Sequence, residues 1–287
     1  MSEAAPARRG LPAGVLPMLA SVATFALANV AVKAVPRIPA HEIVFFRALV
    51  TLVLGWLLIR RQGLSPWGVN KPMLLARGAA GTLALLLYFH TLQHLPLGTA
   101  VTLQNTSPIF TILIAALWLG ERPRWLQLPF LALAFAGVAV IKGAGGGVSL
   151  SMLVIALAAA VFSGVAYNLV RRLRTSDHAL VVVFYFPFVS MLVVGPWTAL
   201  SWVTPSAIEL GALLGIGLAT TVAQILLTVA YQRGSAANVS ASTYLGVVLA
   251  LGFGALFWAE IPTPMQLLGV LITVGGVALC TWLGPRG

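Results

Sequence analysis

Residues 121–127 read ERPRWLQ, and residues 260–266, 139 positions later, read EIPTPMQ. The shared pattern Glu-x-Pro-x-x-x-Gln uses residue types that are less common here than Ala, Leu and Gly, so a match between them is more informative. The same displacement, here called the repeat shift, aligns Gly78 with Gly217, Thr82 with Thr221, and residues 137–139 with residues 276–278. The sequence therefore contains an internal repeat.

The composition of the 287 residues decides the solvent in which this repeat folds. Hydrophobic residues make up 60% of the chain and charged residues 8%, and the mean hydropathy is +0.99. Soluble domains are about 45–50% apolar and about 25% charged. A soluble fold of this size could not hide so much apolar surface, a disordered chain would be polar, and the single cysteine, Cys280, excludes a disulfide scaffold. The lipid bilayer is the remaining solvent.

Ten apolar runs are long enough to cross about 30 Å of hydrocarbon as helices. They lie near residues 12–32, 42–59, 72–92, 97–119, 125–141, 150–170, 179–202, 208–231, 235–258 and 265–284. Continuous runs of this length differ from the alternating segments of about 10 residues that form β-barrels. We therefore expect an all-α membrane protein with ten transmembrane helices. The expected segments are an N-terminal tail (1–11), a first five-helix repeat (12–142), a Gly-rich linker (143–149), a second five-helix repeat (150–284) and a C-terminal end (285–287).

The two repeats are expected to be inverted, because each half contains an odd number of spans. The second copy then enters the membrane in the opposite direction, which places Glu121 and Glu260 on opposite faces. With the N-terminus inside, 13 Lys and Arg residues fall on the inner side and 3 on the outer side. An excess of these residues marks the cytoplasmic face. The sequence thus predicts an integral, multi-pass protein of a bacterial inner membrane with both termini in the cytoplasm.

The fourth span carries a resemblance to a known family. It begins with small residues at 99–101, contains Pro108 and ends at Glu121, whereas its counterpart keeps Glu260 but has Val247 at the position that matches Pro108. Together with ten helices in two copies, this pattern resembles the drug/metabolite transporter superfamily, in its EamA-type exporters. The resemblance implies transport by alternating access through a central cavity between the repeats. Its amino-acid exporter group implies amino-acid substrates, including aromatic ones.

Polar residues within the hydrocarbon are costly and tend to face a cavity or the bundle interior. Their depth follows from the helical rise of about 1.5 Å per residue. The candidates for substrate binding are Gln104, Asn105, Tyr88, His90, Gln224, Thr243, Tyr244 and Arg47. Because span four and its counterpart are matching helices, their polar residues are expected to meet at the interface between the repeats.

Other roles remain open for several of these residues. Gln104 and Asn105 are also typical of hydrogen bonds between membrane helices. Three roles are open for Arg47: it binds a substrate carboxylate, pairs with Glu42, or extends to the outer headgroups. His90 is either a proton-linked switch or a neutral, hydrogen-bonded side chain.

We expect a secondary transporter that exports small amphipathic metabolites, with amino acids as the favoured class. The alternatives are a sugar-phosphate antiporter, which would need several central Arg or Lys residues, a multidrug exporter, and a lipid scramblase or membrane-embedded enzyme. The sequence lacks zinc-protease, serine-hydrolase and nucleotide-binding motifs, so it predicts no enzyme activity, no cofactor and no metal site. The expected partners are a small-molecule substrate and the bilayer, without nucleic acid. The oligomeric state stays open, and a monomer is compatible with the sequence.

Overall fold

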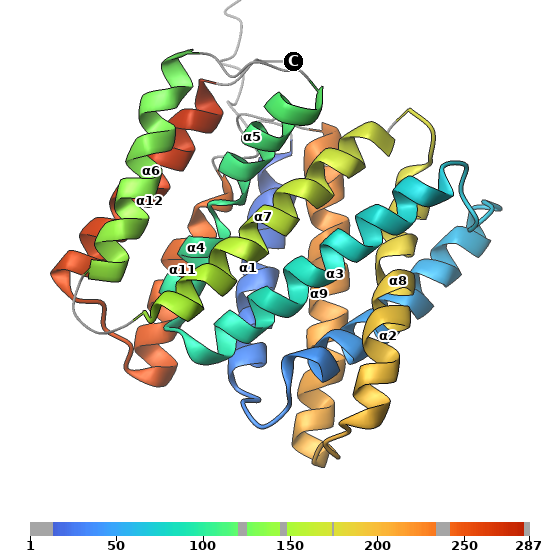
Figure 1. Cartoon of the computed structure of the whole chain (residues 1–287). Coiled ribbons are helices and arrows are strands. Elements are labelled where there is room, and N and C mark those ends of the chain that lie inside the picture. Colours follow the sequence, from blue (N-terminus) through green and yellow to red (C-terminus); the bar gives the residue numbers. More distant parts are fainter. Residues whose placement is uncertain (1–13, 120–124, 144–147, 174, 234–241, 284–287) are drawn as a thin grey trace, which may run out of the picture.

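Helices make up all regular structure in the residues that the computed structural model describes, which are 14–119, 125–143, 148–173, 175–233 and 242–283. The first half contains α1 (Val15–Lys33), α2 (Ala40–Arg61), α3 (Lys71–His94), α4 (Leu97–Gln104), α5 (Ser107–Leu119), the 3₁₀ helix η1 (Trp125–Gln127) and α6 (Leu128–Gly143). The second half contains α7 (Leu150–Leu173), α8 (Ala179–Leu200), α9 (Ala207–Arg233), α11 (Leu245–Trp258) and α12 (Pro264–Trp282). Successive spans run in alternate directions through one bundle (Figure 1).

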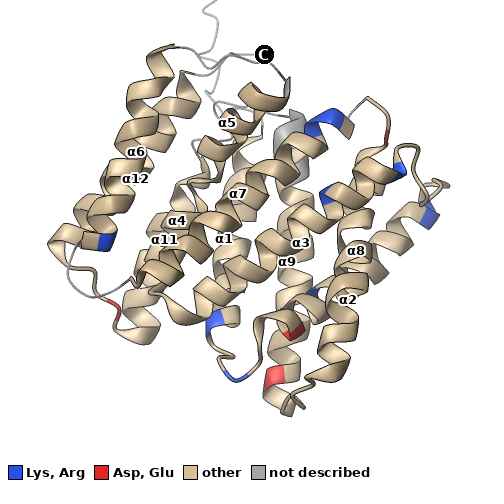
Figure 2. Cartoon of the chain, viewed as in Figure 1, with Lys and Arg blue, Asp and Glu red and all other residues tan. Residues whose placement is uncertain are grey.

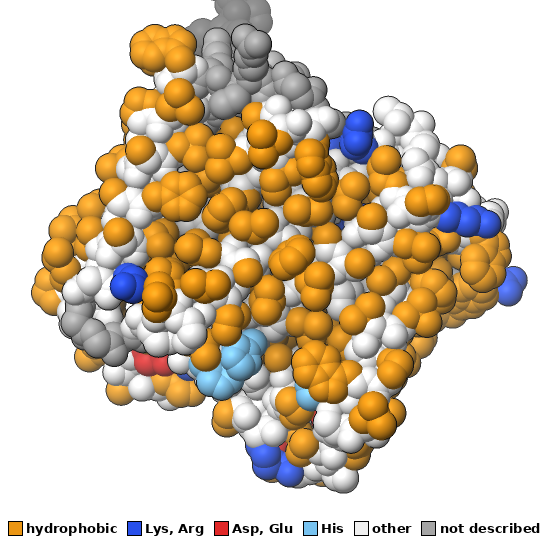
Figure 3. Space-filling model, in the orientation of Figure 1, with side chains coloured by type: hydrophobic (Ala, Val, Ile, Leu, Met, Phe, Trp, Pro, Cys, Tyr) orange, Lys and Arg blue, Asp and Glu red, His pale blue; other side chains and the backbone are white. Residues whose placement is uncertain are grey.

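Nine spans in these described ranges are long and apolar enough to cross a membrane, and α4 and α5 together form one of them. The tenth, α11, has 14 apolar residues, and residues 235–241 of the predicted ninth span lie outside the described residues. Large hydrophobic side chains are exposed on the bundle, among them Leu200, Ile208 and Leu256. Figure 3 shows such side chains covering one face. An apolar surface of this extent requires a lipid environment.

Equivalent contacts recur at positions related by the repeat shift. A Cβ atom added to Gly78 of α3 would approach Val189 of α8 to 2.6 Å. A Cβ atom added to Gly217 of α9 would approach Val50 of α2 to 2.7 Å. The repeat shift turns the first contact into the second, because Gly78 becomes Gly217 and Val50 becomes Val189. The two halves therefore use the same close approach of helices.

A pair of hydroxyl groups repeats in the same way. Thr82 and Ser190 lie 2.8 Å apart between their oxygens, and Thr51 and Thr221 lie 2.9 Å apart. The repeat shift again exchanges the two pairs, which relates the halves by a pseudo-two-fold axis. Because each half has five spans, matching helices such as α1 and α7 run in opposite directions (Figure 1). The predicted all-α fold of two inverted five-helix repeats is confirmed.

The helices of one half pack mainly on helices of the other. The pairs are α1 with α9, α3 with α7, α2 with α8, α4 with α11 and α6 with α12. In the last pair, a Cβ atom on Gly137 would lie 2.4 Å from Thr273, and one on Gly276 would lie 2.7 Å from Ala134. These two contacts are also exchanged by the repeat shift. The interface between the repeats is thus the core of the molecule.

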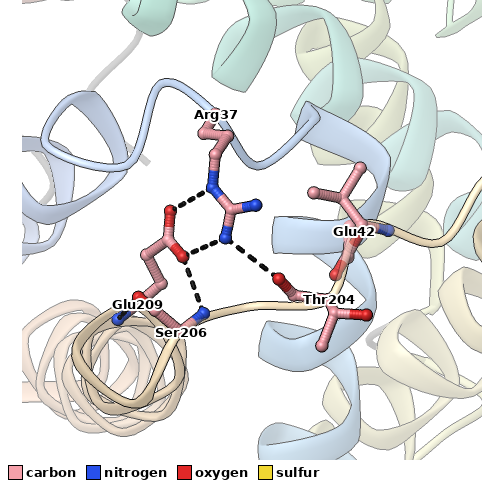
Figure 4. A network of polar contacts seen from close by, with 6 residues as sticks. Arg37, Glu42, Thr204, Ser206 and Glu209 are labelled. Carbon is pink, nitrogen blue, oxygen red and sulfur yellow. Dashed lines mark hydrogen bonds and ion pairs between the residues drawn. The ribbon is translucent and has the colours of Figure 1, made fainter.

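Charged residues gather mainly at the two ends of the bundle (Figure 2). At the end where α1 finishes, Arg37 joins the α1–α2 loop to the α8–α9 connection (Figure 4). Its Nε donates to Glu209 at 2.9 Å, and its Nη2 bonds both Glu209 and the Thr204 carbonyl. With most charges at the ends, most of the middle of the bundle is apolar, as the bilayer favours.

Candidate functional site

A cavity of about 300 Å³ lies between the two repeats. Residues of α1, α2, α3, α4, α7, α8 and α9 line it, together with residues just before and within α11. The lining on α1 runs from Met18 to Asn29, and the lining on α9 is Gln224 and Leu227. The lining is thus central along α1, and along α9 it lies toward the end of the helix. Its volume is at the lower limit of the range for small-molecule sites.

The fourth span is broken beside this cavity. α4 ends at Gln104 and α5 begins at Ser107. Pro108 has no N–H to donate to the Gln104 carbonyl, and its ring cannot pack against that carbonyl in a straight helix. At the break, the side chain of Asn105 donates to the Val101 carbonyl at 3.0 Å. The break leaves Gln104 and Asn105 on the cavity wall.

The counterpart of this break occurs in the second repeat without a proline. Tyr244, which matches Asn105, forms a turn immediately before α11, and the Val247 N–H donates to its carbonyl at 3.1 Å. Thr243 and Gly246, on either side of that turn, line the cavity. Both repeats therefore interrupt the same helix at the same level. In the second, Val247 shows that proline is not required.

An arginine and a phenylalanine face each other at the pseudo-two-fold axis. The repeat shift relates Arg47 of α2 to Phe186 of α8, so they occupy equivalent positions of the two repeats. The guanidinium carbon of Arg47 lies 5.2 Å from the Phe186 ring centroid. Arg77 of α3 packs on the same ring, at 4.6 Å. Both guanidinium groups therefore pack on the same aromatic ring and lie close to each other.

The two arginines have little electrostatic compensation. Arg47 is 8% exposed, and its Nε and the Nε and Nη1 of Arg77 are buried without a hydrogen-bond partner among the described residues. No ion pair joins Glu42 and Arg47 among the described side chains. One carboxylate oxygen of Glu42 accepts from the Val203 N–H at 3.1 Å. Burial also excludes an extension of Arg47 to the headgroups.

The cavity wall contains no Asp or Glu among the described residues. Within the same part of the chain, no group of three or more His, Cys, Asp or Glu side chains could hold a metal ion. The electrostatic character of the site is therefore set by two guanidinium groups, a strongly positive pair in a low-dielectric surrounding.

Neutral polar groups complete the cavity wall. The Gln104 amide donates to the Ser163 hydroxyl at 2.9 Å, whereas its Oε1 is buried without a partner in the described structure. Tyr88 and Asn29 also line the cavity. The wall thus contains an acceptor at Gln104 that has no partner in the described structure, and aromatic surface at Tyr88 and Phe186.

The structure brings six of the eight predicted residues together at the cavity. They are Gln104, Asn105, Tyr88, Gln224, Thr243 and Arg47. His90 lies outside its lining, with its ring centroid 4.1 Å from that of His94. Tyr244 also lies outside the lining, and its hydroxyl is 3.3 Å from that of Thr281 on α12.

Sequence reasoning misses several residues of the wall, above all Arg77, Phe186, Asn29 and Ser163. The count of basic residues places Arg77 at the inner surface because it follows closely on the start of a span, yet α3 begins at Lys71 and carries it into the bundle. The repeat itself could have indicated Phe186, because this residue matches Arg47. Asn29 and Ser163 are single polar residues in apolar helices, a signal of the same kind as Gln104.

The opposite end of the bundle is closed by an ion pair between a buried lysine and a partly exposed glutamate. Lys33 Nζ lies 2.6 Å from Glu260 and donates to the Leu95 carbonyl at 2.6 Å. The second oxygen of Glu260 accepts from the Leu97 N–H at 2.7 Å. These four residues, here called the Lys33–Glu260 clamp, join the end of α1, the α3–α4 connection and the segment after α11. The clamp therefore ties the two repeats together beyond the cavity.

The sequence is similar to a family of transporters and to two named exporters. The sequence model of the EamA-like transporter family matches residues 12–143 and again residues 150–282. The pseudopaline exporter CntI of Pseudomonas aeruginosa is 38% identical over 273 residues, which cover 94% of this chain and 96% of that protein. A probable terminal-alkyne amino-acid exporter of Streptantibioticus cattleyicolor is 32% identical over 231 residues, covering 75% of this chain and 76% of the relative.

A solved structure shares the fold. It is described only as a crystal structure of a protein, and it superposes with a TM-score of 0.67 over 94% of this chain and 97% of its own. The sequence identity is 20%, so this likeness concerns architecture alone.

Proposed function

The chain belongs to the EamA-like transporter family, and on this premise we propose that it exports small amphipathic metabolites of the amino-acid type by alternating access. The family makes it a secondary transporter of small metabolites in a membrane, and not an enzyme. The proposal adds the substrate class, the direction and the route through the cavity.

One observation carries the proposal: the cavity lies on the pseudo-two-fold axis and takes its wall from both repeats. In inverted-repeat transporters the substrate site is expected near the midplane at the repeat interface, beside interrupted helices. Here the interruptions at Asn105 and Tyr244 occur at matching positions, and Gln104 and Thr243 from the two copies line the same space. Movement of one repeat against the other would then expose this space to either side.

The placement of the cavity supports the direction. The excess of Lys and Arg favours a cytoplasmic position for the end where α1 begins. The cavity lining on α9 lies toward that end, and the Lys33–Glu260 clamp closes the other. This arrangement is suited to loading from the cytoplasm. Two relatives are named as exporters, one of pseudopaline and one probably of a terminal-alkyne amino acid, which supports the same direction. The second name also supports an amino-acid type of cargo.

Counterflow in proteoliposomes tests the proposal. Purified protein should accumulate labelled amino acids against unlabelled ones, and Gln104→Ala should lower the initial rate about tenfold, because it removes one buried polar contact of about 1.4 kcal/mol. Gln62→Ala, at the exposed end of α2, is the matched control and should transport normally. Equal rates in the two variants would exclude Gln104 from the site, and absence of counterflow with every amino acid would reject the substrate class.

A further inference from the structure

We propose that the cavity binds a substrate with two carboxylate groups, one held by Arg47 and one by Arg77. This inference rests on the proposed function and names the substrate class of that site. It starts from an imbalance, because two guanidinium groups line the cavity and no Asp or Glu among the described residues lines it with them.

The imbalance is costly within a membrane. A buried charge that lacks a partner loses its hydration without gaining an ion pair, and arginine does not release its proton in proteins. Both guanidinium groups pack on the face of Phe186, at 5.2 and 4.6 Å from its centroid. A cation–π contact replaces only a part of the lost hydration energy. The site therefore favours an incoming anion.

The geometry of the donors selects the kind of anion. Arginine presents paired N–H groups in a plane, which match the two oxygens of a carboxylate. The two guanidinium groups pack on one ring but come from different helices, α2 and α3, so we assign one carboxylate of a single short ligand to each. A ligand with one carboxylate would leave the second arginine uncompensated.

The other residues of the cavity wall indicate what the rest of the ligand contains. The Oε1 of Gln104 is a buried acceptor without a partner in the described residues, so it suits an N–H donor of the ligand. Phe186 and Tyr88 offer apolar surface to a short carbon skeleton. The combination of two anionic sites with one acceptor indicates an amino or imino dicarboxylate in place of a neutral amino acid.

The experiment compares acids with their amides on the purified full-length protein. The probes are L-glutamate, L-2-aminoadipate and glutarate, with L-glutamine and L-leucine as ligands that have one carboxylate, and glucose 6-phosphate as a phosphate ester. Thermal shift titrations give an apparent Kd for each. The dicarboxylates should raise the melting temperature, and glutamate should bind at least about 10-fold more tightly than glutamine, as expected for one additional charge-assisted pair.

Substitutions of the two arginines locate the effect. Arg47→Gln and Arg77→Gln should each weaken binding of the dicarboxylates by about 10- to 100-fold, while Arg47→Lys, which keeps the charge but loses the planar fork, should fall between them and the wild type. The control is Arg60→Gln, which removes the same charge at an exposed position where Arg60 packs on Trp56 at 4.8 Å. It should bind like the wild type.

A second measurement does not depend on the folding of the variants. Phenylglyoxal modifies accessible guanidinium groups, and mass spectrometry should show that glutamate or 2-aminoadipate protects Arg47 and Arg77 of the wild type, whereas glutamine does not.

The outcomes distinguish failure of the dicarboxylate assignment from failure of the proposed export of amino acids. Equal binding of glutamate and glutamine, or unchanged binding in both arginine variants, overturns the dicarboxylate assignment and leaves amino-acid export standing. Binding of glucose 6-phosphate alone overturns it in favour of phosphate esters. A panel in which no dicarboxylate binds also overturns it, and only the further absence of counterflow with neutral amino acids would remove the proposed function.

Discussion

Asp177 shows how a single carboxylate organises one end of the bundle. It accepts from the Val69 N–H at 2.5 Å, the Asn70 N–H at 3.2 Å and the Ser176 hydroxyl at 2.7 Å. Partial desolvation alone would raise the pKa of Asp177, but these three hydrogen bonds favour the charged form and hold the pKa below its ordinary value. Gly68, at a φ of 61°, provides the left-handed turn that brings Val69 to the carboxylate.

This arrangement gives a pH-dependent prediction. A carboxylate with a lowered folded-state pKa stabilises the fold above its ordinary value of 3.8, and this contribution disappears as the pH falls through the lowered pKa. The wild type should therefore melt at a higher temperature than Asp177→Asn near neutral pH, and the difference should close below about pH 4. Melting curves of the detergent-purified proteins over a pH series measure it. A difference that is constant down to about pH 3 would contradict the assigned role.

Residue chemistry also explains which site residues can be predicted. The depth of a side chain follows from its position along a span, which is why the sequence indicates Gln104, Asn105 and Thr243. Which side of the helix a side chain faces depends on how the helices pack, and this cannot be read from its position in the sequence. Tyr244 has a suitable depth but lies against Thr281 of α12, outside the cavity lining.

At the scale of elements, the spans are predictable because hydrophobicity over about 20 residues is a property of the sequence itself. The predicted and observed ends differ by a few residues, as with 42–59 against Ala40–Arg61. The division of span four into α4 and α5 is only partly predictable. Pro108 indicates it, but the matching turn at Tyr244 has no such signal. That turn depends on tertiary contacts.

The pair α6 and α12 yields the prediction that belongs to this scale. A Cβ atom on Gly276 would lie 2.7 Å from the backbone of α6, whereas its neighbour Gly275 has no atom within 4 Å of an added Cβ. Gly276→Leu should separate the helices and destabilise the fold by about 1–3 kcal/mol. Gly275→Leu is the matched control and should melt like the wild type. Equal melting temperatures for the two variants would show that close packing at Gly276 is not needed.

At the scale of the whole molecule, the Lys33–Glu260 clamp and the cavity lie at different levels of the same interface. Ala100 of α4, which is 1% exposed, lies between Leu97 of the clamp and Gln104 of the cavity. A closed clamp should therefore protect position 100 from reagents that arrive from the clamp end.

Cysteine labelling tests this closure. In a chain in which Cys280 is replaced by Ala, maleimide should modify Ala100→Cys slowly, and the addition of Glu260→Gln should accelerate the reaction about tenfold, because loss of the ion pair shifts the population toward an open end by about 1.4 kcal/mol. Asp177→Asn, which removes a carboxylate at the other end, should leave the rate unchanged. Identical rates with and without Glu260→Gln would show that the clamp does not control access.

The symmetry of the contacts has a consequence for the other state of the transporter. Under the repeat shift, Lys33 and Glu260 correspond to Arg172 and Glu121, again a basic and an acidic residue. Because the two repeats have equivalent sequences in opposite orientations, the opposite-facing conformation can use the same kinds of contacts. If each repeat adopts the conformation that the other repeat has now, the Lys33–Glu260 ion pair breaks at one membrane face and its counterpart forms at the other. The substrate then leaves on the side opposite to the one from which it entered.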